Sequence, residues 1–169
     1  GDSLAKIAKR LGTTVELITR NNTIARPDRI QEGDRIRVVT GRFAVAVSKK
    51  RNELLLTMNG QFFKRYAVSC GKDNRTPVGT FVINDKIVEP PWWRPDGKVV
   101  PYGDKENILG TRLMSIKATG QTPDAKGYGI HGTWDEASIG KSASAGCVRM
   151  RNPEVEEAFI LLPIGTPVT

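Results

Sequence analysis

The spacing of apolar residues divides the chain into a short helical part and a longer part built from strands. From Leu4 to Leu11 the apolar residues recur every three or four positions, as on one face of a helix, and Gly12 follows where a helix commonly ends. Thr13 and Glu16 have the spacing of a capping box, which predicts that a second short helix begins there. The first part of the chain is therefore expected to contain two helices.

Beyond residue 42 the apolar period changes to two, which is typical of half-buried strands. One helix is expected near the end of the chain, with Asn152 as its cap and Pro153 in its first turn. The pattern indicates an α+β protein whose larger part is a mainly-β sandwich with a short C-terminal helix. The predicted strands lie at residues 43–47, 53–58, 62–70, 80–84 and 113–117.

Residues 90–111 form a long stretch rich in proline and glycine. A loop of this length inside a compact domain is usually functional or mobile. Trp92 and Trp93 either line a groove or fix the loop to the body of the domain, and the sequence leaves both roles open.

The candidate chemistry is concentrated between Tyr128 and Met150. This stretch holds the only histidine, His131, and one of the two cysteines, Cys147. An imidazole close to a cysteine is a common way to generate the thiolate nucleophile. The Ser-Ala-Gly-Cys-Val run also lets consecutive backbone N–H groups point at one spot, as an oxyanion hole requires. A lone cysteine is often a small buried hydrophobe and a lone histidine a core residue, so the pair alone does not establish an enzyme.

The composition narrows the classes of function. The net charge of +8 is spread along the chain without a basic cluster or a recognition motif, so no nucleic-acid partner is expected, and a polyanionic cell wall would suit such a protein. No apolar run is long enough to span a membrane. One histidine and no C-x-x-C pair are too few ligands for a standard zinc site, so no metal and no cofactor are expected. The sequence also allows a Cys70–Cys147 disulfide in an oxidising compartment, but this disulfide would block Cys147 as a nucleophile.

The string H-G-T, then A-S-I-G, then S-x-S-x-G-C-V-R-M closely resembles the active-site signature of the L,D-transpeptidase catalytic domain of the YkuD type. T-P-x-G at residues 76–79 also recurs in that family. The resemblance runs from about residue 42 to the end, and a catalytic domain is expected at residues 41–169. It implies that Cys147 is the nucleophile, His131 the base and the Gly132 carbonyl the third member of the triad. Many members have His or Lys where this chain has Ala145, a departure that bears on the acyl acceptor or the rate.

Further site residues follow from the same stretch. The amides of Gly146 and Cys147 are oxyanion-hole candidates, and the hydroxyl of Tyr128 could contribute. Arg149 presents a bidentate fork that could hold a substrate carboxylate, with an ordinary ion pair as the alternative. Three further candidates for substrate contact, for which packing or loop shaping is the alternative role, are Trp134, Ser142 and Ser144.

The reaction implied by the resemblance is acyl transfer in cell-wall cross-linking. The thiolate attacks the carbonyl of the L-centre of a diamino acid in a peptidoglycan tetrapeptide stem, releases D-alanine, and passes the acyl group to an amine of another stem. Water as acceptor would make the protein an L,D-carboxypeptidase instead. Family members of this kind are also acylated by carbapenems. A monomer in the periplasm or cell wall is expected, and because the chain begins without Met, a targeting segment would not appear in it.

Residues 1–39 resemble the LysM module through G-D-S-L-x-x-I-A, a later N-N, and I-x-x-G-D-x-I-x-V. The resemblance implies a βααβ fold, expected at residues 1–40, that binds N-acetylglucosamine-containing glycans such as peptidoglycan strands. The first strand would precede Gly1 and is missing, so the alternating stretch at residues 30–38 lacks an obvious partner strand. The module therefore either binds glycan or acts as a packed appendage.

Three functions remain open on the sequence, with the transpeptidase favoured. A catalytically silent wall-binding protein would rely on the LysM-like module alone. A papain-like cysteine hydrolase would need an Asn or Asp side chain as the third triad member, and neither residue type lies beside His131 in the sequence.

Overall fold

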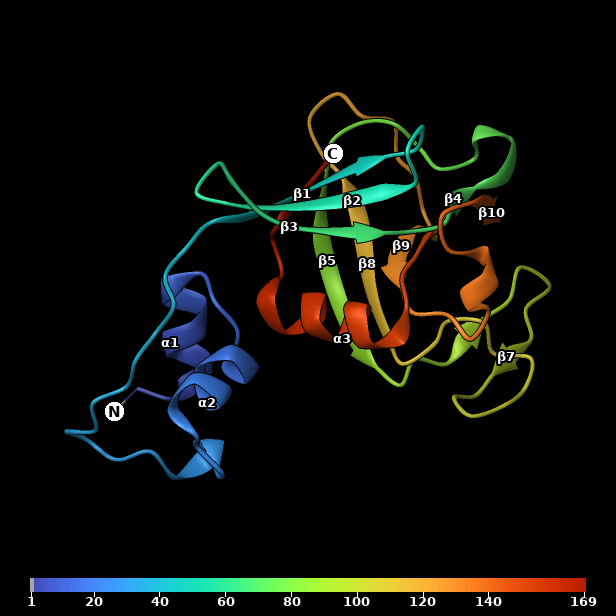
Figure 1. Ribbon diagram of the computed structural model, residues 1–169. Helices are drawn as coiled ribbons and strands as arrows, with labels where there is room; N and C mark the ends of the chain where they lie inside the picture. The colour runs from blue at the N-terminus through green and yellow to red at the C-terminus, as the bar shows by residue number, and fades with distance from the viewer. Residues whose placement is uncertain (1) are drawn as a thin grey trace.

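The computed structural model describes residues 2–169 and shows a small helical part followed by a larger part built around one sheet (Figure 1). Short 3-10 turns occur at Pro27–Arg29, Lys72–Asn74 and Glu136–Ser138. The elements are α1 (Leu4–Leu11), α2 (Val15–Asn22), β1 (Phe43–Ser48), β2 (Glu53–Met58), β3 (Gln61–Ala67), β4 (Cys70–Gly71), β5 (Phe81–Val88), β6 (Trp92–Trp93), β7 (Val99–Val100), β8 (Arg112–Ala118), β9 (Gly129–His131), β10 (Ser142–Ser144), β11 (Val148–Arg149), α3 (Asn152–Leu161) and β12 (Pro167–Val168).

The main sheet has eight strands in the order β11-β9-β8-β5-β12-β1-β2-β3. The β9–β11 and β1–β12 pairs are parallel, and the other neighbours are antiparallel. Ser69, just beyond β3, and Arg149 in β11 exchange both backbone hydrogen bonds, at 2.9 and 2.8 Å. The two ends of the strand order therefore meet, and the sheet folds over onto itself.

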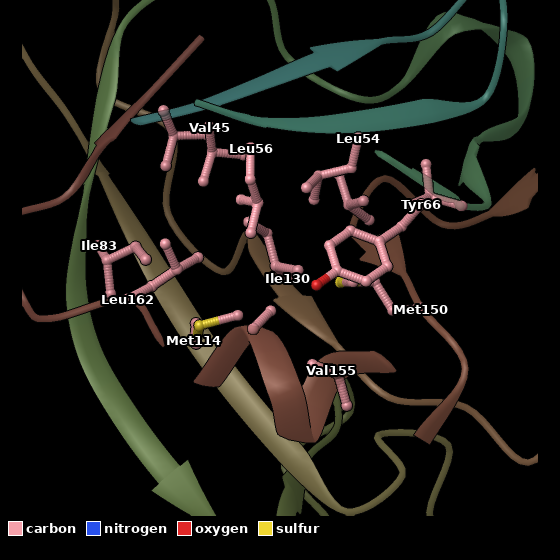
Figure 2. Packing of buried hydrophobic residues seen from close by; sticks show 14 of the residues in the cluster. Val45, Leu54, Leu56, Tyr66, Ile83, Met114, Ile130, Met150, Val155 and Leu162 are labelled. Atoms are coloured by element: carbon pink, nitrogen blue, oxygen red, sulfur yellow. The ribbon is translucent and has the colours of Figure 1, made fainter. Parts of the chain in front are cut away.

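The core lies between the two portions of this folded sheet, with α3 covering its open side (Figure 2). In that view β1 and β2 send aliphatic side chains toward those of β5, β8 and β9, and α3 contributes from below. The predicted mainly-β domain with a short C-terminal helix is confirmed. Fully buried members of the core include Val45, Leu54, Leu56, Ile83, Met114, Ile130, Val155 and Leu162.

The cap predicted for the C-terminal helix is wrong. Helix α3 begins at Asn152 itself, its N-cap position is Arg151, and no side chain caps that end. The Asn152 carboxamide oxygen instead accepts a hydrogen bond from the Thr111 N–H at 3.1 Å. Asn152 therefore connects α3 to the segment that enters β8. Its carboxamide oxygen lies so close to Gly110 and Gly132 that a Cβ atom on either glycine would collide with it.

In the helical part, the prediction of two helices is confirmed, with one change in the capping residue. Ser3 caps α1, and Gly12 ends it in the left-handed conformation (φ 65°). Thr14, not Thr13, caps α2, because its hydroxyl oxygen accepts from the Leu17 N–H at 3.1 Å. An N-cap side chain accepts from the N–H two or three positions further on, and the helix begins one residue later than expected, which makes Thr14 the cap.

The strand expected at residues 30–38 does not form. The Asn22 carboxamide takes the place of a partner strand at one residue, accepting from the Arg37 N–H and donating to the Arg37 carbonyl, both at 2.7 Å. Ile36 and Val38 still pack, half-buried, against the helices. The stretch is therefore held by one side chain and by apolar contacts.

Candidate active site

The parallel pairing of β9 and β11 brings the predicted base and nucleophile together. His131 is the last residue of β9, and Cys147 directly precedes β11, whose Val148 is in register with Ile130. Residues 16 positions apart in the chain thus lie at one place in the fold. Both side chains line a cleft of about 890 Å³.

The imidazole of His131 is 2% exposed, and burial lowers its pKa to about 4. Its Nδ1 lies 2.6 Å from the Gly132 carbonyl oxygen. Because a carbonyl can only accept, the contact with Gly132 places the hydrogen of the neutral ring on Nδ1 and leaves Nε2 as the nitrogen that takes a proton. Hydrogen bonding to the backbone of Gly132 and of Leu109 raises the pKa of the ring against the effect of burial. The ring is therefore neutral at pH 7, and its hydrogen-bond partner is the Gly132 carbonyl, which the sequence offered as the third member of the triad.

Cys147 is a free thiol, half-buried, with its Sγ 3.5 Å from the Gly127 carbonyl oxygen. Burial raises the pKa of the thiol, and the Gly129 backbone and the charge of Arg149 act in the opposite direction. Cys70 is also a free thiol and is fully buried, so the disulfide that the sequence left open is not formed. At rest, therefore, the cleft holds a neutral thiol and a neutral imidazole rather than a preformed thiolate.

The backbone around Cys147 is held by two hydroxyl groups. Ser144 accepts from the Gly146 N–H at 3.1 Å and donates to the Cys147 carbonyl at 2.6 Å. Thr76 donates to the Gly146 carbonyl at 2.8 Å. Within residues 2–169 the Cys147 N–H has no protein acceptor. Of the two predicted oxyanion donors, the Gly146 N–H is thus already engaged and the Cys147 N–H is free.

Gly146 is required by its surroundings. Its φ of 143° is rarely adopted by other residues, and a Cβ atom there would lie 2.6 Å from Cε1 of Tyr128. The Tyr128 ring thereby packs directly on the loop that carries the thiol, and Tyr128 also lines the cleft.

Arg149 lines the same cleft. Its Nε is buried without a hydrogen-bond partner, and no carboxylate of residues 2–169 lies within ion-pair distance of it. The ordinary ion pair that was the alternative for this residue is therefore not formed. A guanidinium in this position is available to an anionic ligand.

Of the three remaining predicted substrate contacts, only Ser144 lines this cleft. Ser144 borders it, but its hydroxyl is engaged with the backbone as described. Ser142 is exposed on β10, where its hydroxyl donates to Asn52 at 3.4 Å. Trp134 is 55% exposed and faces Tyr102, with ring centroids 6.4 Å apart. Ser142 and Trp134 are absent from the cleft lining.

The structure adds residues that the sequence did not assign. Trp92 and Trp93 both line the cleft from β6, which forms a small hairpin with β7 inside the 90–111 stretch, so the groove-lining role is the one observed. Thr76, whose hydroxyl holds Gly146, is the first residue of T-P-x-G. That motif was its signal in the sequence. Ile108 and Leu109, which also belong to the 90–111 stretch, line the cleft as well.

The chain matches the family model of the L,D-transpeptidase catalytic domain (YkuD) over residues 42–169 and that of the LysM domain over residues 1–39. The chain belongs to the L,D-transpeptidase family. The predicted family, enzyme class and fold are thereby confirmed.

Relatives agree with this assignment. The putative L,D-transpeptidase YqjB of Bacillus subtilis is 41% identical over 125 residues, which are 73% of this chain and 68% of that protein. The putative L,D-transpeptidase YkuD of Bacillus licheniformis is 30% identical over 176 residues, which cover 100% of this chain and 93% of that protein.

Two solved structures share the fold. An L,D-transpeptidase from Mycobacterium smegmatis superposes with a TM-score of 0.60 at 19% identity, over 76% of this chain and 58% of that chain. An L,D-transpeptidase in complex with imipenem superposes with a TM-score of 0.57 at 18% identity, over 82% of this chain and 63% of that chain. This chain thus spans about three fifths of the solved chains that it resembles.

Proposed function

We propose that this L,D-transpeptidase uses Cys147 to take an acyl group from a peptidoglycan tetrapeptide stem and transfers it to an amine of a second stem. One observation carries the proposal. In a chain of this family, a free thiol and a buried imidazole with an unprotonated Nε2 line the same cleft.

In the first step, Nε2 of His131 takes the thiol proton as sulfur attacks the carbonyl carbon of the L-centre. The carbonyl electron pair moves to oxygen, and the tetrahedral intermediate collapses by expelling the amine of D-alanine, which receives the proton from Nε2. The hydrogen bond from Nδ1 to the Gly132 carbonyl persists throughout and stabilises the transient imidazolium.

Because both resting pKa values disfavour charge, the ion pair forms only as the reaction proceeds. The developing oxyanion needs a donor. We assign that role to the Cys147 N–H, with the hydroxyl of Tyr128 as a second candidate, and we leave out the engaged Gly146 N–H.

Arg149 supplies the positive charge that a stem peptide requires, since D-alanine ends in a carboxylate. Its guanidinium has no carboxylate partner in residues 2–169 and lies in the cleft beside the thiol. We therefore assign Arg149 to the substrate carboxylate. Trp92 and Trp93 form the apolar wall of that cleft.

The second step returns the acyl group to an amine nucleophile, whose proton Nε2 accepts. Water in place of the amine would give carboxypeptidase activity. We further propose that residues 1–40 act as a LysM module that binds the glycan strands, that residues 41–169 form the catalytic domain, and that the protein works as a monomer outside the cytoplasm. No helix of residues 2–169 has the length and apolar character needed to cross a membrane.

The test is the intact mass of the full chain before and after incubation with imipenem under reducing conditions. We expect one adduct per chain, lost in Cys147→Ala and retained in Cys70→Ala, since the Cys70 thiol is fully buried. Incubation with a disaccharide tetrapeptide should then release D-alanine and give a cross-linked dimer. An unmodified wild-type chain would contradict the proposal, and D-alanine release without dimer would favour the carboxypeptidase.

A further inference from the structure

The peptide bond between Gly146 and Cys147 is oriented from outside the cleft by a single hydroxyl group. We propose that Thr76 is a positioning residue that aims the Cys147 N–H at the reacting oxygen of the acyl substrate. The inference rests on the proposed role of Cys147 as nucleophile.

The two hydrogen bonds of the Thr76 hydroxyl fix its direction. Its oxygen accepts from the Gly71 N–H at 2.7 Å, and its own hydrogen is donated to the Gly146 carbonyl at 2.8 Å. Both bonds are buried, and Thr76 is only 7% exposed. Since a hydroxyl has one hydrogen and the Gly71 amide already supplies a donor, the donation to Gly146 is the arrangement that satisfies all three groups.

A planar trans peptide has its C=O and N–H on opposite sides. No cis peptide bond occurs in residues 2–169, so the rule applies to the Gly146–Cys147 unit. Thr76 and Gly146 line an adjoining cavity of about 550 Å³, and neither residue is part of the cleft lining, to which Cys147 belongs. We infer that the Gly146 carbonyl bonded by Thr76 faces that cavity and that the Cys147 N–H, on the opposite side of the peptide, faces the cleft.

The anchor itself is rigid. Lys49 Nζ donates to the Thr76 carbonyl at 2.8 Å and so fixes the backbone of this residue as well. A Cβ atom on Gly71 would lie 2.6 Å from the Thr76 nitrogen and 2.9 Å from the Gly146 Cα, which shows how closely the three backbones approach. The other side of the loop is held by Ser144. The Cys147 N–H is therefore the one polar backbone group of Gly146 and Cys147 left for a ligand.

The direction of the Cys147 N–H should affect reactions of the thiol that form an oxyanion and leave other reactions of the thiol unaffected. When sulfur attacks an ester, the C–S bond forms, the thiol proton passes to Nε2 of His131, and the carbonyl electron pair becomes an oxyanion before the alcohol leaves. When sulfur displaces iodide from iodoacetamide, no oxyanion develops at the reacting carbon. Misdirecting the Cys147 N–H should therefore slow acylation and leave alkylation unchanged.

The experiment compares these two reactions of the same thiol in the full chain. Nitrophenolate release from p-nitrophenyl acetate measures acylation, and mass spectrometry measures the rate of alkylation by iodoacetamide. The test variant is Thr76→Val, which keeps the shape and removes both hydrogen bonds. Thr80→Val is the matched control, because its hydroxyl donates to the Thr119 carbonyl at 3.1 Å, away from the thiol. Thr76→Ser restores the hydroxyl.

We expect Thr76→Val to lower the acylation rate constant by about 10- to 100-fold, somewhat less than the loss of a complete oxyanion donor, with the alkylation rate unchanged. Thr76→Ser should recover acylation, and Thr80→Val should behave as wild type. An equal fall in both reactions would show that the hydroxyl only holds the loop together and would overturn the proposal. Unchanged acylation in Thr76→Val would also overturn it, and so would a loss of acylation in Thr76→Ser. If the valine variant does not fold, the serine variant alone still tests the proposal.

The ester needs no recognition of a stem peptide. A wild-type chain that is acylated by it but makes no product from the tetrapeptide would refute the proposed substrate and leave the result for Thr76 intact. A wild-type thiol that is alkylated but never acylated would overturn the positioning role itself.

Discussion

The hydroxyl of Thr14, in the LysM module, donates to the backbone carbonyl of Ile160 at the end of α3. Lys86 Nζ of the catalytic domain donates to the neighbouring Phe159 carbonyl. The last carbonyls of a helix have no partner within it, and they attract donors and positive charge. Helix α3 is therefore completed at its C-terminal end by residues from both modules, and α2 contacts α3 (Figure 1).

Replacing Thr14 with valine should destabilise the protein, because the side chain both caps α2 and bonds α3. Each of these contributions is typically about 1 kcal/mol. We expect a loss of about 2 kcal/mol in the free energy of unfolding, measured by urea denaturation. Thr13→Val is the matched control, because the Thr13 hydroxyl is buried without a partner and its removal should be neutral or stabilising. Equal losses in the two variants would refute the coupling.

The buried imidazole predicts an acid-dependent loss of stability. The pKa of His131 is about 4 in the folded chain, against about 6.5 when unfolded, so protons favour the unfolded state. The contribution is fully present above pH 6.5 and is lost as the pH falls toward 4. It amounts to about 3 kcal/mol over that window, taking 1.36 kcal/mol per pKa unit.

Denaturation of wild type and His131→Gln at pH 7 and pH 4 measures this loss. Between pH 7 and pH 4 the unfolding free energy of wild type should fall by that amount relative to the unfolding free energy of His131→Gln. A difference that does not change with pH would mean that the imidazole titrates normally.

The raised pKa of the Cys147 thiol predicts slow alkylation at neutral pH. The iodoacetamide rate should rise with pH through a midpoint above that of an ordinary thiol, since only the thiolate reacts. Mass spectrometry of Cys70→Ala over pH 6–10 measures it at one site. A plateau reached below pH 7 would reveal a resting thiolate–imidazolium pair, contrary to the geometry described.

The catalytic residues were predictable because they are rare in this chain and keep a fixed spacing. His131 is the only histidine, and Cys147 lies in a string of small residues that has few other uses. The alternation of apolar residues indicated most strands of the large sheet, because a half-buried strand buries every second residue. What the sequence did not show was the state of these groups, because the pKa values of His131 and Cys147 depend on burial by residues distant in the chain.

Two short polar side chains have partners that the sequence did not reveal. Asn152 was predicted to cap a helix, and for Ser144 substrate contact and loop shaping were both open. In the structure both side chains satisfy backbone groups brought near by the fold, the Thr111 N–H in one case and the loop of Cys147 in the other. Short polar side chains can bond any backbone group in reach, and tertiary structure decides which one.

The unpaired guanidinium of Arg149 gives a prediction about substrate binding. Arg149→Lys keeps the charge but loses the planar fork that binds a carboxylate through two parallel bonds. A charge-assisted hydrogen bond contributes about 1.5–3 kcal/mol, so we expect KM for the tetrapeptide to rise by about 10- to 100-fold with a smaller change in kcat. Acylation by p-nitrophenyl acetate, which has no carboxylate, should be affected far less. An equal loss with both substrates would assign Arg149 to the chemistry at Cys147 instead of to the binding of the stem peptide.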